Sequence, residues 1–189
     1  MTQEQVNKLC LIGIDCGANG GIAIKTPNND KSVVRMPQDI RDLRDILQHY
    51  ADNYQTLVIV EKLSVRTDDI DLSAENKKAA MGKLFRIQKM IANFEHIKAI
   101  IEACGLPYVL VHSYSWQTKL GLRIKGEEKH ARKLRYREIA QEHNPDIRVT
   151  LWNSDALLIL EFGEFALCNQ EKWVRAQLPE REQYKVFTD

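Results

Sequence analysis

Three acidic residues stand where an apolar segment meets a loop. Asp15 closes the first apolar run, Glu61 follows the apolar stretch 56–60, and Asp155 opens an apolar helical segment. Acids at such junctions can point into one cleft at the edge of a sheet. Mg²⁺ takes oxygen ligands and keeps some of its waters, so two or three carboxylates and a phosphate suffice to hold it. Two such ions about 4 Å apart can activate a water and stabilise the leaving oxygen at phosphorus. The pattern favours metal-dependent phosphodiester hydrolysis.

Each of these acids also has a simpler interpretation when it is taken alone. Asp15 can begin a turn before Gly17, and Glu61 can be a surface residue at the end of a strand. Asp155 can be an acid in the first turn of a helix, where the helix dipole stabilises it. The three acids together, in their order along the chain, favour the metal site.

A basic segment lies between the second and third acids. The chain of 189 residues has a net charge of only +1, yet the stretch from Lys119 to Arg137 holds eight Lys or Arg against two Glu. One interpretation is a solvated helix face. The other is one basic surface on the protein; if the protein binds DNA, that surface would follow the phosphates, which gives affinity without reading sequence and makes binding depend steeply on salt. The residues predicted for that contact are Lys119, Arg123, Lys125, Lys129, Arg132 and Lys133.

The first half of the chain alternates between strand and helix patterns. Short apolar runs separated by glycine and proline turns predict three strands in an antiparallel meander. Helical spacing follows from Asp39, and the continuous apolar stretch 56–60 predicts a strand buried on both faces. A polar loop, a long helix and another strand complete this half. The predicted elements are strands 9–16, 22–25, 32–36, 56–60 and 108–111, the loop 62–76 and the helix 77–104.

The second half is mostly helical. We predict a short helix from Trp116 to Leu120, capped by Ser113 or Ser115, with Trp116 as a core residue. Asn153 or Ser154 is predicted to cap the apolar helix. The later elements are the basic loop 121–126, the helix 127–142, the apolar helix 155–167 and the tail 169–189, to which the pattern assigns no structure.

The order of these elements predicts the fold class. A three-strand meander followed by β-α-β-α-β-α implies an α/β protein with one five-stranded mixed sheet flanked by helices. That is the ribonuclease H-like order. We expect one nuclease domain over residues 1–168 and a tail of unknown role over 169–189.

At this point the sequence resembles a known family, the RuvC-type Holliday-junction resolvases, particularly their phage and mobile-element branch. The resemblance runs from about residue 9 to 167. The matching segments are 12–17 (Ile-Gly-Ile-Asp-Cys-Gly) with 20–23 (Gly-Gly-Ile-Ala) for the first motif, 58–62 (Val-Ile-Val-Glu-Lys) for the second, and 155–159 (Asp-Ala-Leu-Leu-Ile) with 161–163 (Glu-Phe-Gly) for the last. Between them, Met81-Gly82, Gly105 to Tyr108, Trp116 and Leu120-Gly121 follow the family's middle region.

The resemblance implies a homodimeric endodeoxyribonuclease that cuts symmetrically across a four-way DNA junction. Asp15, Glu61 and Asp155 would then be ligands of two Mg²⁺ ions, for which Mn²⁺ can substitute. Lys129 lies where the family often has a lysine near the site, and it would neutralise developing phosphate charge. Its simpler interpretation is one more cation in a basic helix. The long helix 77–104 is the candidate dimer interface.

Two features depart from the family pattern. Trp152 occupies the position three residues before the last aspartate, where the family has an acid or a histidine, and an indole cannot bind Mg²⁺. Asn153 or Ser154 would have to orient a metal-bound water instead, or the fourth ligand is absent. The loop after Glu61 carries acids where the family's loop approaches the junction centre, while two apolar residues there offer a wedge against unstacked bases. The acids are Asp68, Asp69 and Asp71, and the apolar residues are Leu63 and Val65.

Other classes of protein fit less well. No apolar stretch reaches the about 18 residues that span a bilayer, and the polar N-terminus lacks a signal peptide, so we expect a cytoplasmic, DNA-associated protein with no membrane partner. The four cysteines are scattered, as free thiols would be. An actin-like or sugar-kinase-like ATP-binding protein needs a second domain and a second phosphate loop. A nuclease for RNA:DNA hybrids or other branched DNA, and an inactive junction-binding module, remain alternatives.

Overall fold

One five-stranded mixed sheet organises the computed structural model, which describes residues 1–17, 19–63 and 77–187. Its strand order is β3-β2-β1-β4-β5. The strands β1, β2 and β3 form the predicted antiparallel meander, and β4 and β5 run parallel to β1. The strands are β1 (Cys10–Ile14), β2 (Gly21–Lys25), β3 (Lys31–Arg35), β4 (Thr56–Lys62) and β5 (Tyr108–His112). The predicted sheet is confirmed.

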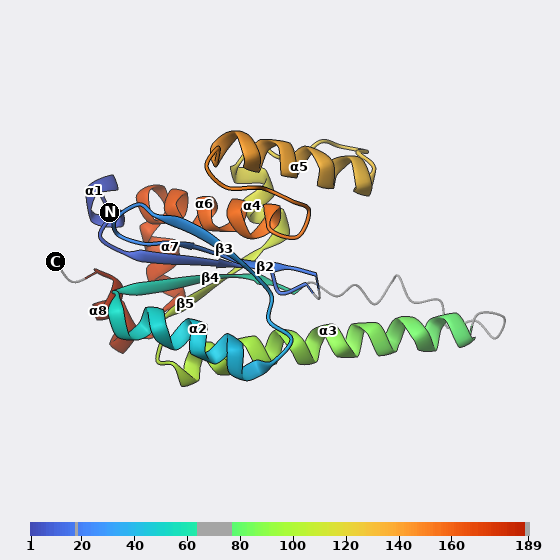
Figure 1. Ribbon diagram of the computed structural model, residues 1–189, viewed down its shortest axis with the longest axis horizontal. Helices are drawn as coiled ribbons and strands as arrows, with labels where there is room; N and C mark the ends of the chain where they lie inside the picture. Colours follow the sequence, from blue (N-terminus) through green and yellow to red (C-terminus); the bar gives the residue numbers. More distant parts are fainter. Residues whose placement is uncertain (18, 64–76, 188–189) are drawn as a thin grey trace.

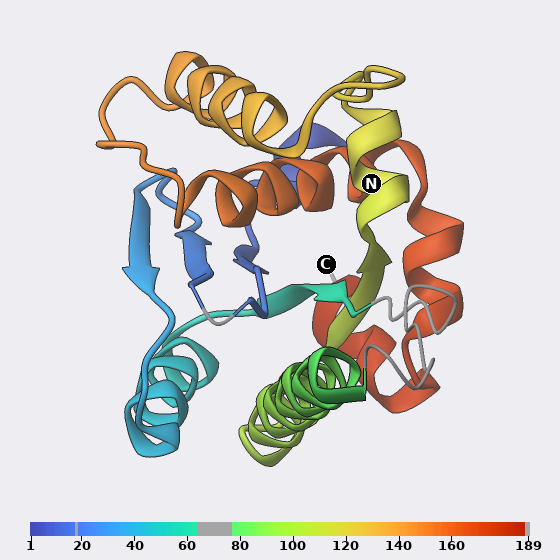
Figure 2. The ribbon, with the colours of Figure 1, turned by 90° about the vertical axis from the view of Figure 1, so that its right-hand side faces the viewer.

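Helices cover both faces of this sheet (Figure 2). One face carries α2 (Ile40–Asn53) and α3 (Lys77–Ala103), and the other carries α4 (Ser113–Lys119), α5 (Lys129–His143) and α6 (Ser154–Asn169). All five residues of β1 are buried. Side chains alternate along a strand, so Ile12 and Ile14 join the core with α2 and α3 while Leu11 joins the core with α6. This two-sided burial explains why the central strands are apolar without alternation.

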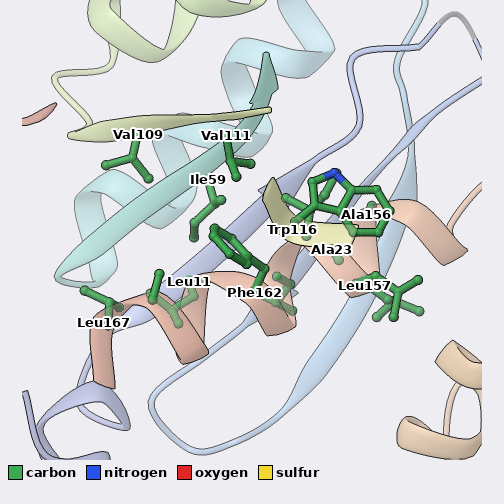
Figure 3. Close-up of a cluster of buried hydrophobic side chains, with 14 of the residues drawn as sticks. Leu11, Ala23, Ile59, Val109, Val111, Trp116, Ala156, Leu157, Phe162 and Leu167 are labelled. Atoms are coloured by element: carbon green, nitrogen blue, oxygen red, sulfur yellow. The ribbon is translucent and has the colours of Figure 1, made fainter. Parts of the chain in front are cut away.

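The helix α6 packs on the sheet through buried apolar side chains that include Ala156 and Phe162 (Figure 3), and two glycines lie at its contacts with the strands. A Cβ atom built at Gly13 would lie 2.6 Å from the Ala156 carbonyl oxygen and 2.6 Å from the Leu160 amide nitrogen. A Cβ atom at Gly163, on the helix side, would lie 2.6 Å from Cδ1 of Ile59. Larger residues would push helix and strands apart. The two glycines therefore set the distance between α6 and the central strands, Gly13 at β1 and Gly163 at β4.

The residues after 168, to which the sequence assigned no structure, form two helices. These are α7 (Glu171–Gln177) and α8 (Glu180–Phe187). Val174, Leu178 and Val186 are buried in the same core as α6, and α7 contacts α6 and β5. A four-residue helix, α1 (Gln3–Val6), begins the chain with Thr2 as its cap. Each of these helices carries only one or two apolar anchors, too few to produce a helical period in the sequence.

The observed helix caps differ in part from the predicted ones. Asp39 caps α2 through its side chain, a role that the sequence analysis did not assign. The N-cap of α4 is His112, so neither Ser113 nor Ser115 has that role. Asn153 occupies the N-cap position of α6, but its side chain makes no capping hydrogen bond. Its amide is used instead within the preceding loop.

The long helix α3 has two dissimilar halves. Its second half packs on the sheet through Phe94, Ile97 and Ile101, which are buried. Its first half extends beyond the end of the sheet (Figure 1). There, large apolar side chains remain exposed, among them Met81 at 65% and Phe85 at 57%. Within the described ranges, none of the helices is both long and apolar enough to cross a membrane.

Candidate active site

The sheet register places Asp15 beside Glu61. Ile14 of β1 pairs with Val60 of β4 in the parallel ladder, so the next residue on each strand is level with the other. Asp15 and Glu61 also share the parity of Leu11 and Ile59, which face α6. Two carboxylates from neighbouring strands thus meet on the α6 side of the sheet edge.

Asp155 reaches the same edge from the first turn of α6. Ala156, the next residue, lies directly on Gly13, which places Asp155 near the end of β1. Its side chain is almost fully buried at 6% exposure. The Lys133 ammonium of α5 donates to Asp155 Oδ2, and the Ser154 hydroxyl donates to Asp155 Oδ1 at 3.3 Å. Asp155, the third predicted carboxylate, therefore lies next to Asp15 and Glu61 and is paired with the Lys133 ammonium.

Two residues of α4 hold Glu61. The Trp116 indole N–H donates to Glu61 Oε1 at 3.1 Å, and the Ser113 side chain also hydrogen-bonds this carboxylate. The register explains the contact: His112 ends β5 opposite Lys62, so the first turn of α4 starts beside the end of β4. Ser113 and Trp116 are three residues apart and share a helix face. Trp116 is fully buried, which confirms its predicted core position.

Burial and mutual repulsion hold two of the carboxyl groups above their usual pKa. Burial raises the pKa of Glu61 to about 7, Asp15 and Asp155 add repulsion, and the bonds from Ser113 and Trp116 partly oppose the rise. Burial and then the charge of Asp155 also raise the pKa of Asp15, against the Gly17 amide, which donates at 2.9 Å, and Lys133. Carboxyl groups whose pKa values are shifted in this way are typical of functional sites.

The three carboxylates line one hollow of about 930 Å³. Four basic residues of the predicted DNA-contacting set line it too: Arg123, Lys129, Arg132 and Lys133. The Arg123 guanidinium lies 4.4 Å from the ring centre of Tyr114, another lining residue. The hollow therefore joins a buried acidic floor to a basic rim.

The other members of the predicted basic set lie elsewhere. Lys119 and Lys125 are exposed and do not line the hollow. Lys129 was the lysine predicted to neutralise phosphate charge near the site, and it lines the rim of the hollow. Lys133, predicted only as a DNA contact, is the lysine that contacts Asp155. The sequence could not separate them, because residues four apart share one helix face. The Trp116 contact with Glu61 had no sequence signal, since it depends on where α4 begins.

The donor set fits a hard divalent cation in its chemistry. All three side chains offer oxygen atoms, and the repulsion that raises the pKa of Glu61 is what a bound cation relieves. In the ranges that the structure describes, no three acidic, histidine or cysteine side chains are grouped closely enough to hold one ion. Lys133 is paired with Asp155 Oδ2 and Trp116 with Glu61 Oε1, so these two oxygens already have partners within the protein.

Trp152, at the position of the expected fourth ligand, has a packing role. A Cβ atom on Gly21 would lie 2.9 Å from Cε3 of the Trp152 ring, so the indole rests on the backbone of β2. Asn153 is fully buried and accepts from the Thr150 amide at 2.7 Å, which commits its side chain to the loop. The Ser154 hydroxyl donates to Asp155 Oδ1. No described neighbour of Trp152 in this loop supplies an acid to the site. Leu63 is half-buried, and Val65, Asp68, Asp69 and Asp71 lie outside the described residues.

Comparison with known proteins identifies the fold of this chain through solved structures and not through sequence matches. No protein-family model matches the chain, and no curated protein sequence is similar to it. The sheet order with its flanking helices is ribonuclease H-like and matches solved RuvC structures. One is Thermus thermophilus RuvC in complex with a Holliday junction, at 15% identity and a TM-score of 0.50 over 84% of this chain and 94% of that one. A second Thermus thermophilus RuvC structure has 14% identity and a TM-score of 0.46, covering 85% and 96%. At such identity the likeness establishes the fold.

Substituting Trp116 by Phe tests whether the indole positions Glu61. We expect a loss of stability of about 1–3 kcal/mol, as for a core truncation. The indole bond favours the ionised carboxylate, so its loss should also raise the Glu61 pKa, which NMR titration of the carboxyl group measures. A purely structural role would lower the melting temperature and leave the midpoint of that titration unchanged. Phe162→Leu, a truncation in the same core, is the matched control.

Proposed function

We propose that this chain is a divalent-metal-dependent endodeoxyribonuclease that resolves four-way DNA junctions. The observation that carries the proposal is the single hollow in which Asp15, Glu61 and Asp155 lie under a rim of four basic side chains. The likeness to a RuvC structure solved with a Holliday junction supports branched DNA as the substrate class. Mg²⁺, or Mn²⁺ in its place, is the proposed cofactor, with two ions per site.

In this proposal each residue has a defined task. Asp15, Glu61 and Asp155 hold the ions, which when bound supply the Lewis acid that activates water and stabilises the leaving oxygen. Trp116 and Ser113 orient Glu61. Lys133 pairs with Asp155, and with Lys129 near it on the rim it would neutralise charge on a bound phosphate.

The proposed enzyme works as a homodimer, because a four-way junction has two equivalent strands to cut. The first half of α3 supplies a surface for that contact. Its exposed apolar side chains gather on the part of the helix that extends beyond the sheet, and contiguous exposed apolar patches commonly mark interfaces. The residues are Met81, Leu84 and Phe85, with Ile91 one to two turns further along the helix.

The test is cleavage of four DNA substrates in parallel, with Mg²⁺, Mn²⁺ or EDTA: a synthetic four-way junction, a flap, a linear duplex and an RNA:DNA hybrid. We expect cleavage of the junction in preference to the others, only with a metal. A plasmid that extrudes a cruciform should become linear, since a dimer makes both cuts in one encounter. Equal cleavage of junction and duplex would leave a nuclease and contradict the resolvase. Nicked circles without linear product would contradict paired cutting.

A catalytically inactive junction-binding module is the second candidate. It is favoured by the engagement of Asp155 with Lys133, by Trp152 at the fourth position and by the absence of a grouped ligand set among the described residues. Tight junction binding without cleavage under any metal would select it.

A further inference from the structure

A second hollow lies beside the carboxylate site. It measures about 540 Å³, and its lining includes Arg137, Arg148 and Trp152. Asn19 and Leu151 line both hollows, so the two share a rim. None of the described residues that line the second hollow is acidic. It therefore continues the basic surface of the first hollow past Leu151.

The backbone around Arg148 is held in place by buried amides. Asn153, fully buried, donates through Nδ2 to the Arg148 carbonyl at 3.2 Å. On the next residue, the Val149 amide donates to Gln141 Oε1 at 3.0 Å. Gln141 also donates to the Ile147 carbonyl at 2.9 Å, so α5 fixes the loop from its other side. The loop that carries Arg148 is thus prearranged, and a ligand need not order it.

The two arginine side chains are available for a ligand. The Arg137 side chain is 41% exposed and lies 3.8 Å from that of Glu138, which is 64% exposed. An ion pair this long and this exposed contributes little to fixing the Arg137 side chain. Arg148 is exposed, and its hydrogen bond uses the carbonyl and not the guanidinium. Guanidinium groups recognise phosphate by paired N–H donors. Both are thus free to face an anionic ligand.

We propose that the second hollow binds the DNA strand adjoining the cleaved phosphate, with Arg137 and Arg148 on two backbone phosphates and the nucleotide between them against Trp152. Cationic side chains flanking an aromatic ring are how proteins hold unpaired strands without sequence preference. Leu151, 44% exposed, lies on the rim that this strand would cross between the two hollows. Trp152 is thereby a wall of the strand-binding hollow at the position where a metal ligand was expected. The inference rests on the proposed function, because it places the strand relative to the scissile phosphate.

The test compares two double variants that remove the same charge. Arg137→Gln/Arg148→Gln alters the hollow, and Arg41→Gln/Arg44→Gln alters exposed arginines of α2 on the opposite face of the sheet. Binding of a fluorescent four-way junction is measured in EDTA between about 50 and 200 mM salt. Each lost phosphate contact lowers the slope of log K against log salt by about 0.9. The first variant should lose a slope of about 1.8, so between about 50 and 200 mM salt its affinity should fall by a factor about 12-fold smaller than that of the wild type. The control should follow the wild type.

Intrinsic fluorescence gives a second measurement. Trp116 is fully buried and Trp173 packs against Phe162, which leaves Trp152 to respond to a strand in the second hollow. Junction binding should change the emission of the wild type and of Trp173→Phe, and should change that of Trp152→Phe less, by the contribution of Trp116 beside Glu61 alone.

The outcomes separate the inference from the proposed function. If the two double variants bind alike, or Trp152→Phe responds like the wild type, the strand-binding hollow is wrong, whether or not the junction is cleaved. If the wild type binds duplex and junction equally and cleaves neither, the proposed function fails. The slope difference, measured on duplex and single-stranded DNA, then still decides whether Arg137 and Arg148 contact a strand.

Discussion

Asp15→Asn is expected to lower metal-dependent cleavage of a four-way junction roughly a thousandfold or more, while raising the melting temperature of the metal-free protein. Asp15 lies beside both other carboxylates, so it is the group through which a bound cation would be shared. An amide has a neutral oxygen and binds Mg²⁺ poorly. Cleavage rates with the junction in excess, at matched protein concentration, measure the first effect.

The rise in stability follows from the sign of the pKa shift. Burial and the charge of Asp155 raise the pKa of Asp15 in the folded protein. The folded state therefore binds the proton more tightly than the unfolded state, and ionisation at neutral pH destabilises the fold. Asn carries no charge and can still accept the hydrogen bond from the Gly17 amide. Thermal unfolding in EDTA at neutral pH should show the higher melting temperature.

Adding Mg²⁺ should make the melting temperature of the wild type higher than that of Asp15→Asn. A cation that binds only the folded state stabilises it by mass action. The wild type should gain more from Mg²⁺ than Asp15→Asn. Asp30→Asn, at an exposed turn, is the control and should change neither property. Undiminished cleavage by Asp15→Asn, or a melting temperature below that of the wild type in EDTA, would contradict the assignment of Asp15 to the site.

The sheet and its acids were predictable because short-range signals specify them. Apolar runs broken by glycine turns indicate the strands, and an acid at the end of a run is placed by the parallel register without further information. Gly13 illustrates the limit of these signals. The sequence shows its position in the first motif, but only the packing shows that it lets α6 approach β1 and so brings Asp155 close to Asp15.

What the sequence could not predict depends on long-range packing. Lys129 and Lys133 lie on one face of α5, and the angle between α5 and α6 decides which of them reaches Asp155. The Trp116 bond to Glu61 depends on α4 starting immediately after β5. Trp152 could be recognised as unable to bind a metal, but its seat on Gly21 and its place in the second hollow require the folded loop.

The pH dependence of stability in the metal-free protein should show Glu61 directly. Its pKa is about 7 in the folded state, against 4.5 as its ordinary value. Between these two values the folded state holds a proton that the unfolded state has lost, so stability falls as pH rises and becomes level above about 7. The shift corresponds to about 3 kcal/mol at most. Denaturant unfolding in EDTA at a series of pH values measures this fall.

Glu61→Gln isolates that contribution from the other titrating groups. The amide oxygen of Gln still accepts from the Trp116 indole, and the neutral side chain no longer repels Asp15 and Asp155. The free energy of unfolding of the wild type minus that of Glu61→Gln should therefore decline between about pH 4.5 and 7 and be constant above it. Mg²⁺ should stabilise the wild type more at the upper end of this range, because a carboxylate must lose its proton to bind a metal. A difference that stays flat across the window would mean that Glu61 titrates as an ordinary surface acid, and that the three carboxylates do not form one electrostatic unit.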